Sequence, residues 1–302
     1  MCHSNTLDLS TISEANINTL LDEYQNLLFH YGARKLSYDA DKLPALSGIC
    51  ERLHLLLGGE FLAGLWSVDL LRELMWNGRR DDGAHACAPS WSWAGTSMST
   101  VEFSRDLSAV DRFSRSPLDL RVHGQDIELL NSSNPYGEVL SGRLHVTGYT
   151  LPAICFHHSA SNDNTLTRAV LGTAFWDREW VQGKSTDMRD GQPISTLKLY
   201  SGERTRLDMF TPPSSDGHTA LDEQRLSDFS TEYIALLVLL RRGFTGDTCA
   251  WGLIIQAATS QRDGDTYERV AMFELTLRAD HSGDTNEKWF RAIWQSRTIR
   301  LV

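Results

Sequence analysis

The amino-acid sequence predicts an α+β protein, with N-terminal helices packed on a C-terminal antiparallel β-sheet or barrel. In the first quarter of the chain, apolar residues recur every three or four positions, as on the buried stripe of an amphipathic helix. Later segments alternate apolar and polar residues, and their short polar connections favour antiparallel neighbours. We therefore expect a helical segment at 1–86 and a β-rich domain at 87–302, built around one continuous core.

Three helices are expected in the first segment. The first should begin near residue 12 and carry an apolar stripe over 17–31. The second should begin at Pro44, whose missing N–H costs nothing in the first turn of a helix, and it should stop at Gly58. Ser67 is a suitable N-cap for the third helix, which would bury the leucines that follow it.

The β-rich domain contains several segments with the composition of strands. In the clearest of them, Leu144 and Val146 alternate with Arg143 and His145, as on a strand with one buried face. The short connections between the later segments favour an antiparallel meander. The expected strands are 142–150, 196–200, 206–210, 233–240, 250–257, 267–277 and 298–302, with a short helix at 289–294 before the last one.

Composition and charge exclude several classes of function. Hydrophobic residues make up 41% of the chain and nine tryptophans supply bulky core material, so a globular protein is expected. The formal net charge of −10 is spread along the chain without a basic stripe, which argues against nucleic acid as a partner. No signal peptide is visible, and no apolar run approaches the ~20 residues that cross a bilayer, so no membrane partner is expected. Five cysteines without a Cys-x-x-Cys pair fit free thiols in a reducing cytoplasm.

The sequence carries no local motif for a cofactor, a metal or a nucleophile. There is no Walker loop, no Gly-x-Gly-x-x-Gly and no nucleophile elbow, and Cys155 with its neighbouring histidines has the wrong spacing for a zinc site on one strand face. We therefore expect no cofactor and no metal. If the chain is an enzyme, the candidates for general acid–base work are three side chains of one polar loop and one strand-end histidine: Asp81, Asp82, His85 and His157. A solvated loop is the simpler interpretation.

The tryptophans allow two interpretations. Trp91 and Trp93 are two residues apart, so on a strand they would share one face, and Trp66 and Trp76 end apolar segments with helical spacing. The four rings could form an aromatic core that joins the helices to the sheet. They could instead line a pocket for an apolar or cationic small molecule. Both structures need the same residues, so the sequence leaves the two open.

Three segments between residues 34 and 94 carry a family resemblance. They are Arg34-Lys-Leu-Ser-Tyr-Asp-Ala-Asp-Lys-Leu-Pro-Ala-Leu-Ser-Gly48, Phe61-Leu-Ala-Gly-Leu-Trp66 and Pro89-Ser-Trp-Ser-Trp-Ala94. Their order, spacing and composition resemble the stretch that follows the name-giving domain in fungal heterokaryon incompatibility (HET) proteins, and 267–273 looks like part of that family's C-terminal half. The Ala-Leu-Ser-Tyr-x-Trp-Gly-like and Trp-Ile-Asp-x-x-Cys-Ile-like blocks of the HET domain itself do not occur in this sequence. The resemblance therefore implies the accessory region, without the activity of the HET domain.

Three hypotheses of function follow. The resemblance implies a non-catalytic regulatory or recognition module of the fungal non-self response, with a full-length HET protein as partner. The alternative is a cofactor-independent cyclase or isomerase of fungal secondary metabolism, which would enclose a hydrophobic small molecule beside a buried carboxylate or histidine of perturbed pKa. The third is a truncated gene product, which should expose an apolar patch on the helix at 17–31.

Overall fold

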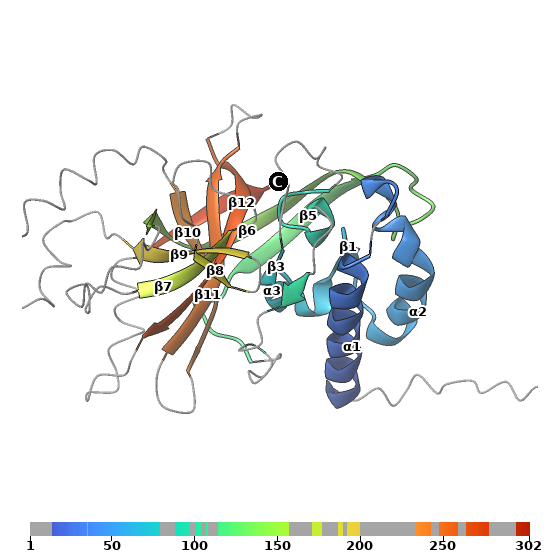
Figure 1. Cartoon of the computed structure of the whole chain (residues 1–302), viewed down its shortest axis with the longest axis horizontal. Helices are drawn as coiled ribbons and strands as arrows, with labels where there is room; N and C mark the ends of the chain where they lie inside the picture. The colour runs from blue at the N-terminus through green and yellow to red at the C-terminus, as the bar shows by residue number, and fades with distance from the viewer. Residues whose placement is uncertain are drawn as a thin grey trace, which may run out of the picture.

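The computed structural model describes most of the helical segment and of the β-rich part. Helices and strands are segregated along the chain and in space: α1 and α2 lie at one end of the molecule, and most strands lie at the other (Figure 1). This confirms the α+β class. The residues described are 14–34, 36–78, 88–96, 101–103, 107, 114–156, 171–176, 187–189, 192–199, 233–242, 248–258, 264–277 and 294–302.

The two long helices lie close to where the sequence places them. Helix α1 (Glu14–Gly32) packs through Leu21, Tyr24 and Leu28, which lie on one face because they are three and four residues apart. The 3-10 turn η3 (Pro44–Leu46) leads directly into α2 (Ser47–Leu57), which ends at Gly58 with a φ of 65°. A preceding 3-10 turn, η2 (Asp39–Asp41), completes this region.

The third helix is much shorter than expected. Ser67 begins a 3-10 turn, η4 (Ser67–Asp69), and α3 (Leu70–Glu73) follows as a single turn. The Ser67 hydroxyl accepts a hydrogen bond from the backbone N–H of Glu60 at 2.7 Å, so it does not cap the helix. The tryptophans at both ends of this region lie in two-residue strands and not in helices. These strands are β1 (Phe61–Leu62), β2 (Leu65–Trp66), β3 (Trp76–Asn77) and β4 (Glu102–Phe103), paired β1 with β2 and β3 with β4.

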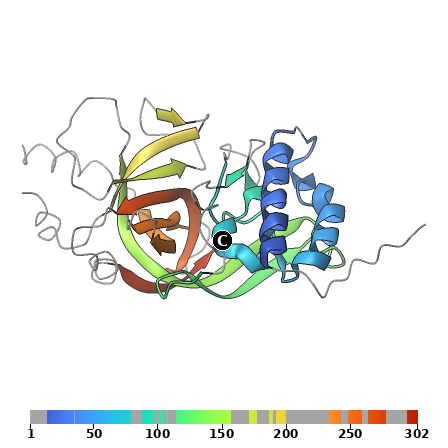
Figure 2. The same cartoon turned by 90° about the horizontal axis from the view of Figure 1, so that it is seen from below.

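Six antiparallel strands form a closed barrel. The pairings run from β6 to β10, β11, β12, β7 and β9, and then back to β6. Figure 2 shows these strands as a ring beside the helices. Strand β8 pairs with β9 on the outside of this ring. The strands are β5 (Arg121–Leu129), β6 (Val139–Phe156), β7 (Leu171–Trp176), β8 (Asp187–Arg189), β9 (Gln192–Leu199), β10 (Tyr233–Arg242), β11 (Thr248–Ala257), β12 (Thr266–Leu277) and β13 (Gln295–Leu301).

The long strand β6 serves two sheets. Its second half belongs to the barrel, whereas its first half pairs with β5 along one edge and with β13 along the other. Strand β13 also pairs with β12 in parallel at two residues. Strands β5, β6 and β13 thus form a three-stranded sheet that extends from the barrel beneath the helices (Figure 2).

Strand β10 separates two apolar cores. Leu236 and Val238 belong to the larger core, together with residues of all three helices, and Ala235 and Leu237 belong to the smaller one. Because successive side chains point to opposite faces, a strand buried on both faces needs a continuous apolar run, and 233–240 is such a run. The larger core draws on residues from both 1–86 and 87–302.

The expected strands at 142–150, 233–240, 250–257 and 267–277 all lie within strands of the structure, and 196–199 lies within β9. The expected strand 298–302 lies within β13 except for its last residue. The expected strand 206–210 and helix 289–294 fall outside the described residues, except for residue 294. No apolar patch lies on α1: its apolar side chains from Ile17 to Tyr31 are buried or half-buried. The patch that the truncation hypothesis requires is therefore not on this helix.

Two glycines of the β5–β6 hairpin provide a test of how tightly the three-stranded sheet packs. A Cβ at Gly142 would overlap the ring of Pro89 and approach Trp91 Cζ2 to 3.2 Å, whereas a Cβ at Gly124 would meet nothing within 4 Å. We expect Gly142→Ala to lower the free energy of unfolding by about 1–3 kcal/mol, measured in urea, because overpacking displaces the neighbours. The matched control Gly124→Ala should change it little. Equal losses in both variants would contradict this packing.

Candidate functional site

The four predicted tryptophans lie together between the helices and the barrel. Trp66, Trp76, Trp91 and Trp93 are all at most 2% exposed and belong to the larger core. Tyr24 of α1 meets the Trp66 ring edge-on, with centroids 6.0 Å apart and planes at 76°. The four rings therefore form a buried aromatic cluster, which we call the tryptophan cluster.

Trp91 and Trp93 do not lie on a strand, so their predicted shared strand face is wrong. Trp91 lies in a turn, and Trp93 begins the 3-10 turn η5 (Trp93–Gly95). The cause is Ser92, whose hydroxyl accepts a hydrogen bond from the Ala94 backbone N–H at 3.0 Å. A serine that bonds its own neighbouring backbone favours a turn over a sheet ladder. Both indoles nevertheless point into the core.

The turn at Ala63 and Gly64 accepts hydrogen bonds from three side chains, one on α1 and two on the turn at 92–93. The Tyr24 hydroxyl and the Trp93 indole N–H both donate to the Gly64 carbonyl, at 2.8 and 2.7 Å, and the Ser92 hydroxyl donates to the Ala63 carbonyl at 2.5 Å. Gly64 has a φ of 101°, and a Cβ there would lie 2.7 Å from Trp93 Nε1. Only glycine fits this conformation without strain. The carbonyls of Ala63 and Gly64, in the second resembling segment, thus accept hydrogen bonds from the side chains of Ser92 and Trp93 in the third.

Arg269 of β12 connects the barrel to the tryptophan cluster. Its guanidinium carbon lies 3.5 Å from the centroid of the Trp76 ring, and its two terminal nitrogens donate to the carbonyls of Leu74 and Trp76 at 2.8 and 2.6 Å. Its backbone N–H donates to Ser90 Oγ at 2.9 Å. At 2% exposure this is a buried cation stabilised by carbonyl dipoles and an aromatic face.

A buried carboxylate lies on the other side of the cluster. Glu73 is fully buried, and its Oε2 accepts a hydrogen bond from the Trp66 backbone N–H at 2.5 Å. On the same short helix Arg72 Nε lies 3.5 Å from Asp69 Oδ2, and both side chains are buried. Each of these charged groups has a polar partner, as a buried charge requires.

Two titratable groups beside Glu73 have raised pKa values. Burial, and then the neighbouring Cys50 and Glu73, raise the pKa of Tyr24 well above its ordinary value. Burial raises the pKa of the Cys50 thiol from 9.0 to about 12, with a hydrogen bond to Tyr24 lowering it and Glu73 raising it. Both groups are therefore neutral at physiological pH, and neither can act as an anionic nucleophile or base there.

A histidine and a tyrosine lie at the rim of the cluster. His54 Nδ1 is 2.6 Å from the hydroxyl of Tyr136, and the His54 ring lies edge-on to Trp66 with centroids 5.8 Å apart. Burial, followed by Glu51 and Cys50, raises the pKa of Tyr136. A half-buried His–Tyr pair is capable of proton transfer. The same region also docks the β5–β6 loop on α2, because the Ser47 hydroxyl donates to the Tyr136 carbonyl at 3.2 Å.

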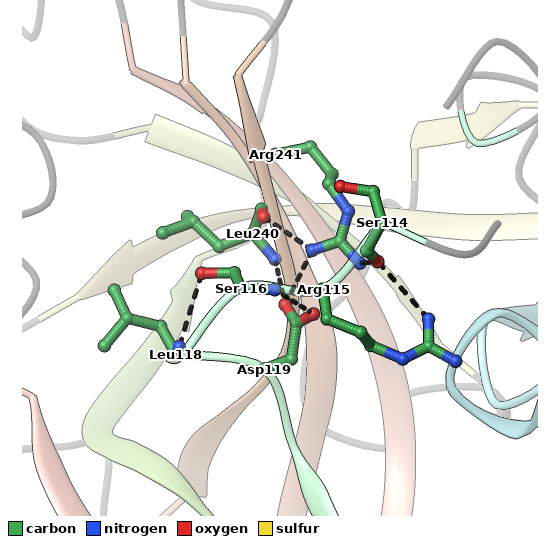
Figure 3. A network of polar contacts seen from close by, with 7 residues as sticks. All are labelled: Ser114, Arg115, Ser116, Leu118, Asp119, Leu240 and Arg241. Atoms are coloured by element: carbon green, nitrogen blue, oxygen red, sulfur yellow. Dashed lines mark hydrogen bonds and ion pairs between the residues drawn. The ribbon is translucent and has the colours of Figure 1, made fainter. Parts of the chain in front are cut away.

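A second buried ion pair lies away from the cluster, where the segment before β5 crosses β10 (Figure 3). Arg241 donates to Asp119 Oδ1 at 2.7 Å and to the carbonyls of Leu240 and Ser114, both at 2.7 Å. Asp119 also accepts the backbone N–H of Leu240 at 3.1 Å and that of Ser116 at 2.8 Å. The Arg241–Asp119 pair fixes the segment before β5 to strand β10, so both side chains serve to stabilise the fold.

The four candidate acid–base residues, Asp81, Asp82, His85 and His157, lie outside the described residues. Within the described part of the chain, no three side chains of His, Cys, Asp or Glu are grouped to hold a metal. The helices that the structure describes include none that is long and apolar enough to cross a membrane.

Comparison with known proteins adds no relative. No family model, curated protein or solved structure matches the chain. The resemblance to the HET family therefore remains a prediction from the three segments.

Sequence reasoning missed the polar groups around the tryptophans. Tyr24, Glu73 and Arg269 come from α1, α3 and β12, and nothing in their local sequence shows that they meet. For Tyr24, the three- and four-residue spacing placed it on the buried stripe of α1 but not against Trp66. The one available signal for Arg269 was a cation directly before the apolar run 270–273, where a buried charge needs a partner.

Replacing Arg269 tests its part in joining the barrel to the cluster. We expect Arg269→Lys to lower the free energy of unfolding by about 2 kcal/mol, because a single ammonium cannot span two carbonyls and stack on Trp76. Urea unfolding followed by tryptophan fluorescence measures this loss. The control Arg297→Lys changes an exposed residue of β13 and should stay within about 0.5 kcal/mol of the wild type. A smaller loss at Arg269 than at Arg297 would contradict the role.

The raised pKa of Cys50 predicts loss of stability in alkali. In the unfolded chain the thiol ionises near 9.0, but in the folded chain only near about 12, so the folded state binds the extra proton between these values. The free energy of unfolding should therefore be independent of Cys50 below pH 9 and fall as the pH rises above it, because a pKa difference of one is worth about 1.4 kcal/mol. Tyr24 contributes in the same direction. In urea titrations from pH 8 to 11, Cys50→Ala should fall less steeply than the wild type; parallel curves would show that the thiol has an ordinary pKa.

Proposed function

We propose that this chain is a non-catalytic recognition module, similar to the accessory region of fungal HET proteins, and that it acts by binding another protein. One observation carries the proposal: the side chains of Ser90, Ser92 and Trp93, in the third resembling segment, bond to the protein's own backbone. Trp93 and Ser92 donate to the Gly64 and Ala63 carbonyls, and Ser90 donates to the carbonyl of Val302. Hydrogen bonds within the fold thus explain the presence of these three side chains, and none of the three is left as a candidate catalytic group.

The buried charges support the same interpretation. Arg269 bonds backbone carbonyls, Glu73 accepts a backbone N–H, and Lys42 donates to the Thr96 carbonyl while its ammonium lies 3.0 Å from Asp39 Oδ1. Catalytic groups instead point into space that a substrate can occupy. Buried charged residues that bond to the protein's own backbone make the fold rigid, and a rigid surface is better suited to binding another protein than to catalysis.

The second candidate is the small-molecule cyclase or isomerase, and two features favour it. The indole N–H groups of Trp66 and Trp91 are buried and have no hydrogen-bond acceptor among the described residues. The His54–Tyr136 pair lies beside Trp66 and is capable of acid–base work. We rank this candidate second because aromatic side chains fill the space beside two of the tryptophans: Tyr24 and Phe61 lie edge-on to Trp66, and Tyr31 lies edge-on to Trp93.

Binding to a HET-domain protein tests the proposal. The purified chain is mixed with full-length HET-domain proteins encoded in the same genome, and complex formation is measured by light scattering after size exclusion and by biolayer interferometry. We expect a saturable complex with at least one of them. The control is the same HET-domain protein with the unrelated, similarly acidic bovine serum albumin in place of the chain.

Catalysis would overturn the proposal. The chain is incubated with a panel of polyketide and terpenoid intermediates, and products are measured by mass spectrometry. Turnover by the wild type that Tyr136→Phe abolishes, without loss of folding, would establish the enzyme in place of the recognition module. Absence of any complex with the HET-domain proteins would equally contradict the proposal.

A further inference from the structure

One face of the three-stranded sheet carries a group of cations. Because directly paired residues of neighbouring strands point to the same side, the register places Arg121 beside Thr147 and Arg300 beside His145. Arg143 precedes His145 by two residues along β6 and points to the same side. With His123 at a bulge of β5, these side chains define the arginine face: Arg121, His123, Arg143, His145 and Arg300.

Hydrogen bonds across the strands confirm this shared orientation. His123 Nε2 lies 2.8 Å from Thr147 Oγ1, and Thr147 Oγ1 lies 2.8 Å from Thr298 Oγ1, which links β5, β6 and β13 in one row. Near them His145 Nε2 is 2.8 Å from Asp126 Oδ2. The side chains of the three strands thus form one continuous polar surface.

The arginine face points away from the core. The alternate residues of the same strands, such as Val146 and Ile299, are buried in the larger core with the helices. On the outward side Arg121, His123 and Arg143 are exposed, and His145 and Arg300 are half-buried. An outside partner could therefore reach this surface without any change in the fold.

The charge of this face opposes that of the whole protein. The chain has a formal net charge of −10 with histidine counted as neutral, yet three arginines lie here with two carboxylates, so the face has a small formal positive excess. Both carboxylates are already engaged, Asp126 with His145 and Glu128 with the hydroxyl of Ser141 at 3.2 Å. No hydrogen bond or ion pair within the described residues engages the side chain of Arg121 or Arg143. The guanidinium group binds carboxylates in a bidentate manner, more specifically than lysine does.

We propose that the arginine face binds an extended, carboxylate-rich segment of a partner protein. The spacing supports this occupant, because Arg121 lies opposite Thr147, four residues along β6 from Arg143, and this separation of ~13 Å matches two same-side repeats of ~7 Å on an extended peptide. A nucleic acid fits less well, since its affinity depends on neutralising many phosphates along a basic stripe. The inference rests on the proposed recognition function and names the surface that performs it.

A labelled peptide tests the inference directly. The probe is a fluorescein-labelled twelve-residue peptide of alternating Glu and Thr, and its binding to the full chain is measured by fluorescence anisotropy at low and high salt. We expect saturable binding that weakens with salt, because exposed charges are screened. The double variant R121Q/R143Q should weaken it by about tenfold, the sum of two exposed ion pairs. The matched control R34Q/R52Q removes two exposed arginines from the helical part and should change affinity by less than about twofold.

Several outcomes would overturn the inference. Equal losses in R121Q/R143Q and R34Q/R52Q would mean attraction by net charge alone, and equal binding of a Gln-for-Glu peptide would mean that carboxylates are not recognised. Tighter binding of a twelve-base-pair DNA duplex than of the peptide would assign the face to nucleic acid. If a HET-domain protein binds R121Q/R143Q as well as the wild type, the arginine face is wrong but the recognition function stands. If the peptide binds through the face but no HET-domain protein binds, the arginine face stands and the proposed function fails.

Discussion

The stacking of Arg269 on Trp76 is the interaction on which the arrangement of helices and barrel depends. One guanidinium bonds two carbonyls of the chain leaving α3 and covers an indole, so a single side chain of β12 fixes the direction of that chain and the plane of that ring. The Nε1–H of the same Trp76 ring donates to the Trp91 carbonyl at 2.8 Å, so the position of this ring also fixes the turn at 91. Without the arginine, both carbonyls would lose a buried hydrogen-bond donor, a loss that packing alone does not offset.

Next to the Arg269–Trp76 contact, the three resembling segments and the residues just beyond them are joined by hydrogen bonds. The Ala63–Gly64 turn accepts hydrogen bonds from Ser92 and Trp93, and the Lys42 ammonium donates to the Thr96 carbonyl just beyond them. Segments that are far apart in sequence thus satisfy one another's backbone groups. Their glycine, serine and tryptophan residues fit this close packing, since a Cβ at Gly64 would overlap the Trp93 ring.

The sequence predicts the fold well where a pattern is local, and less well where it depends on distant partners. The apolar run of β10 and the apolar stripe of α1 predict these two elements correctly. Helix α3 is shorter than predicted, because the hydroxyl of Ser67, its expected N-cap, accepts a hydrogen bond from the Glu60 backbone N–H. The site was predicted only as four tryptophans. A bulge at Val270 shifts the phase of β12, so that Arg269 faces the tryptophan cluster while Ala271 faces the smaller core. Alternation alone places both on one side, and no local signal reveals the bulge.

The two faces of β6 have different roles, and this difference bears on function. Its inward side chains, including Leu144 and Val146, are packed in the larger core, and Gly142 is small because Pro89 and Trp91 lie against it. Its outward side chains, Arg143 and His145, contribute nothing to that core, so the fold places no constraint on their charge. Cations kept on an exposed sheet of an acidic protein weaken its self-repulsion only slightly, because solvent screens them. The proposed partner would account for their grouping where stability does not, and a rigid core behind them reduces the cost of such recognition.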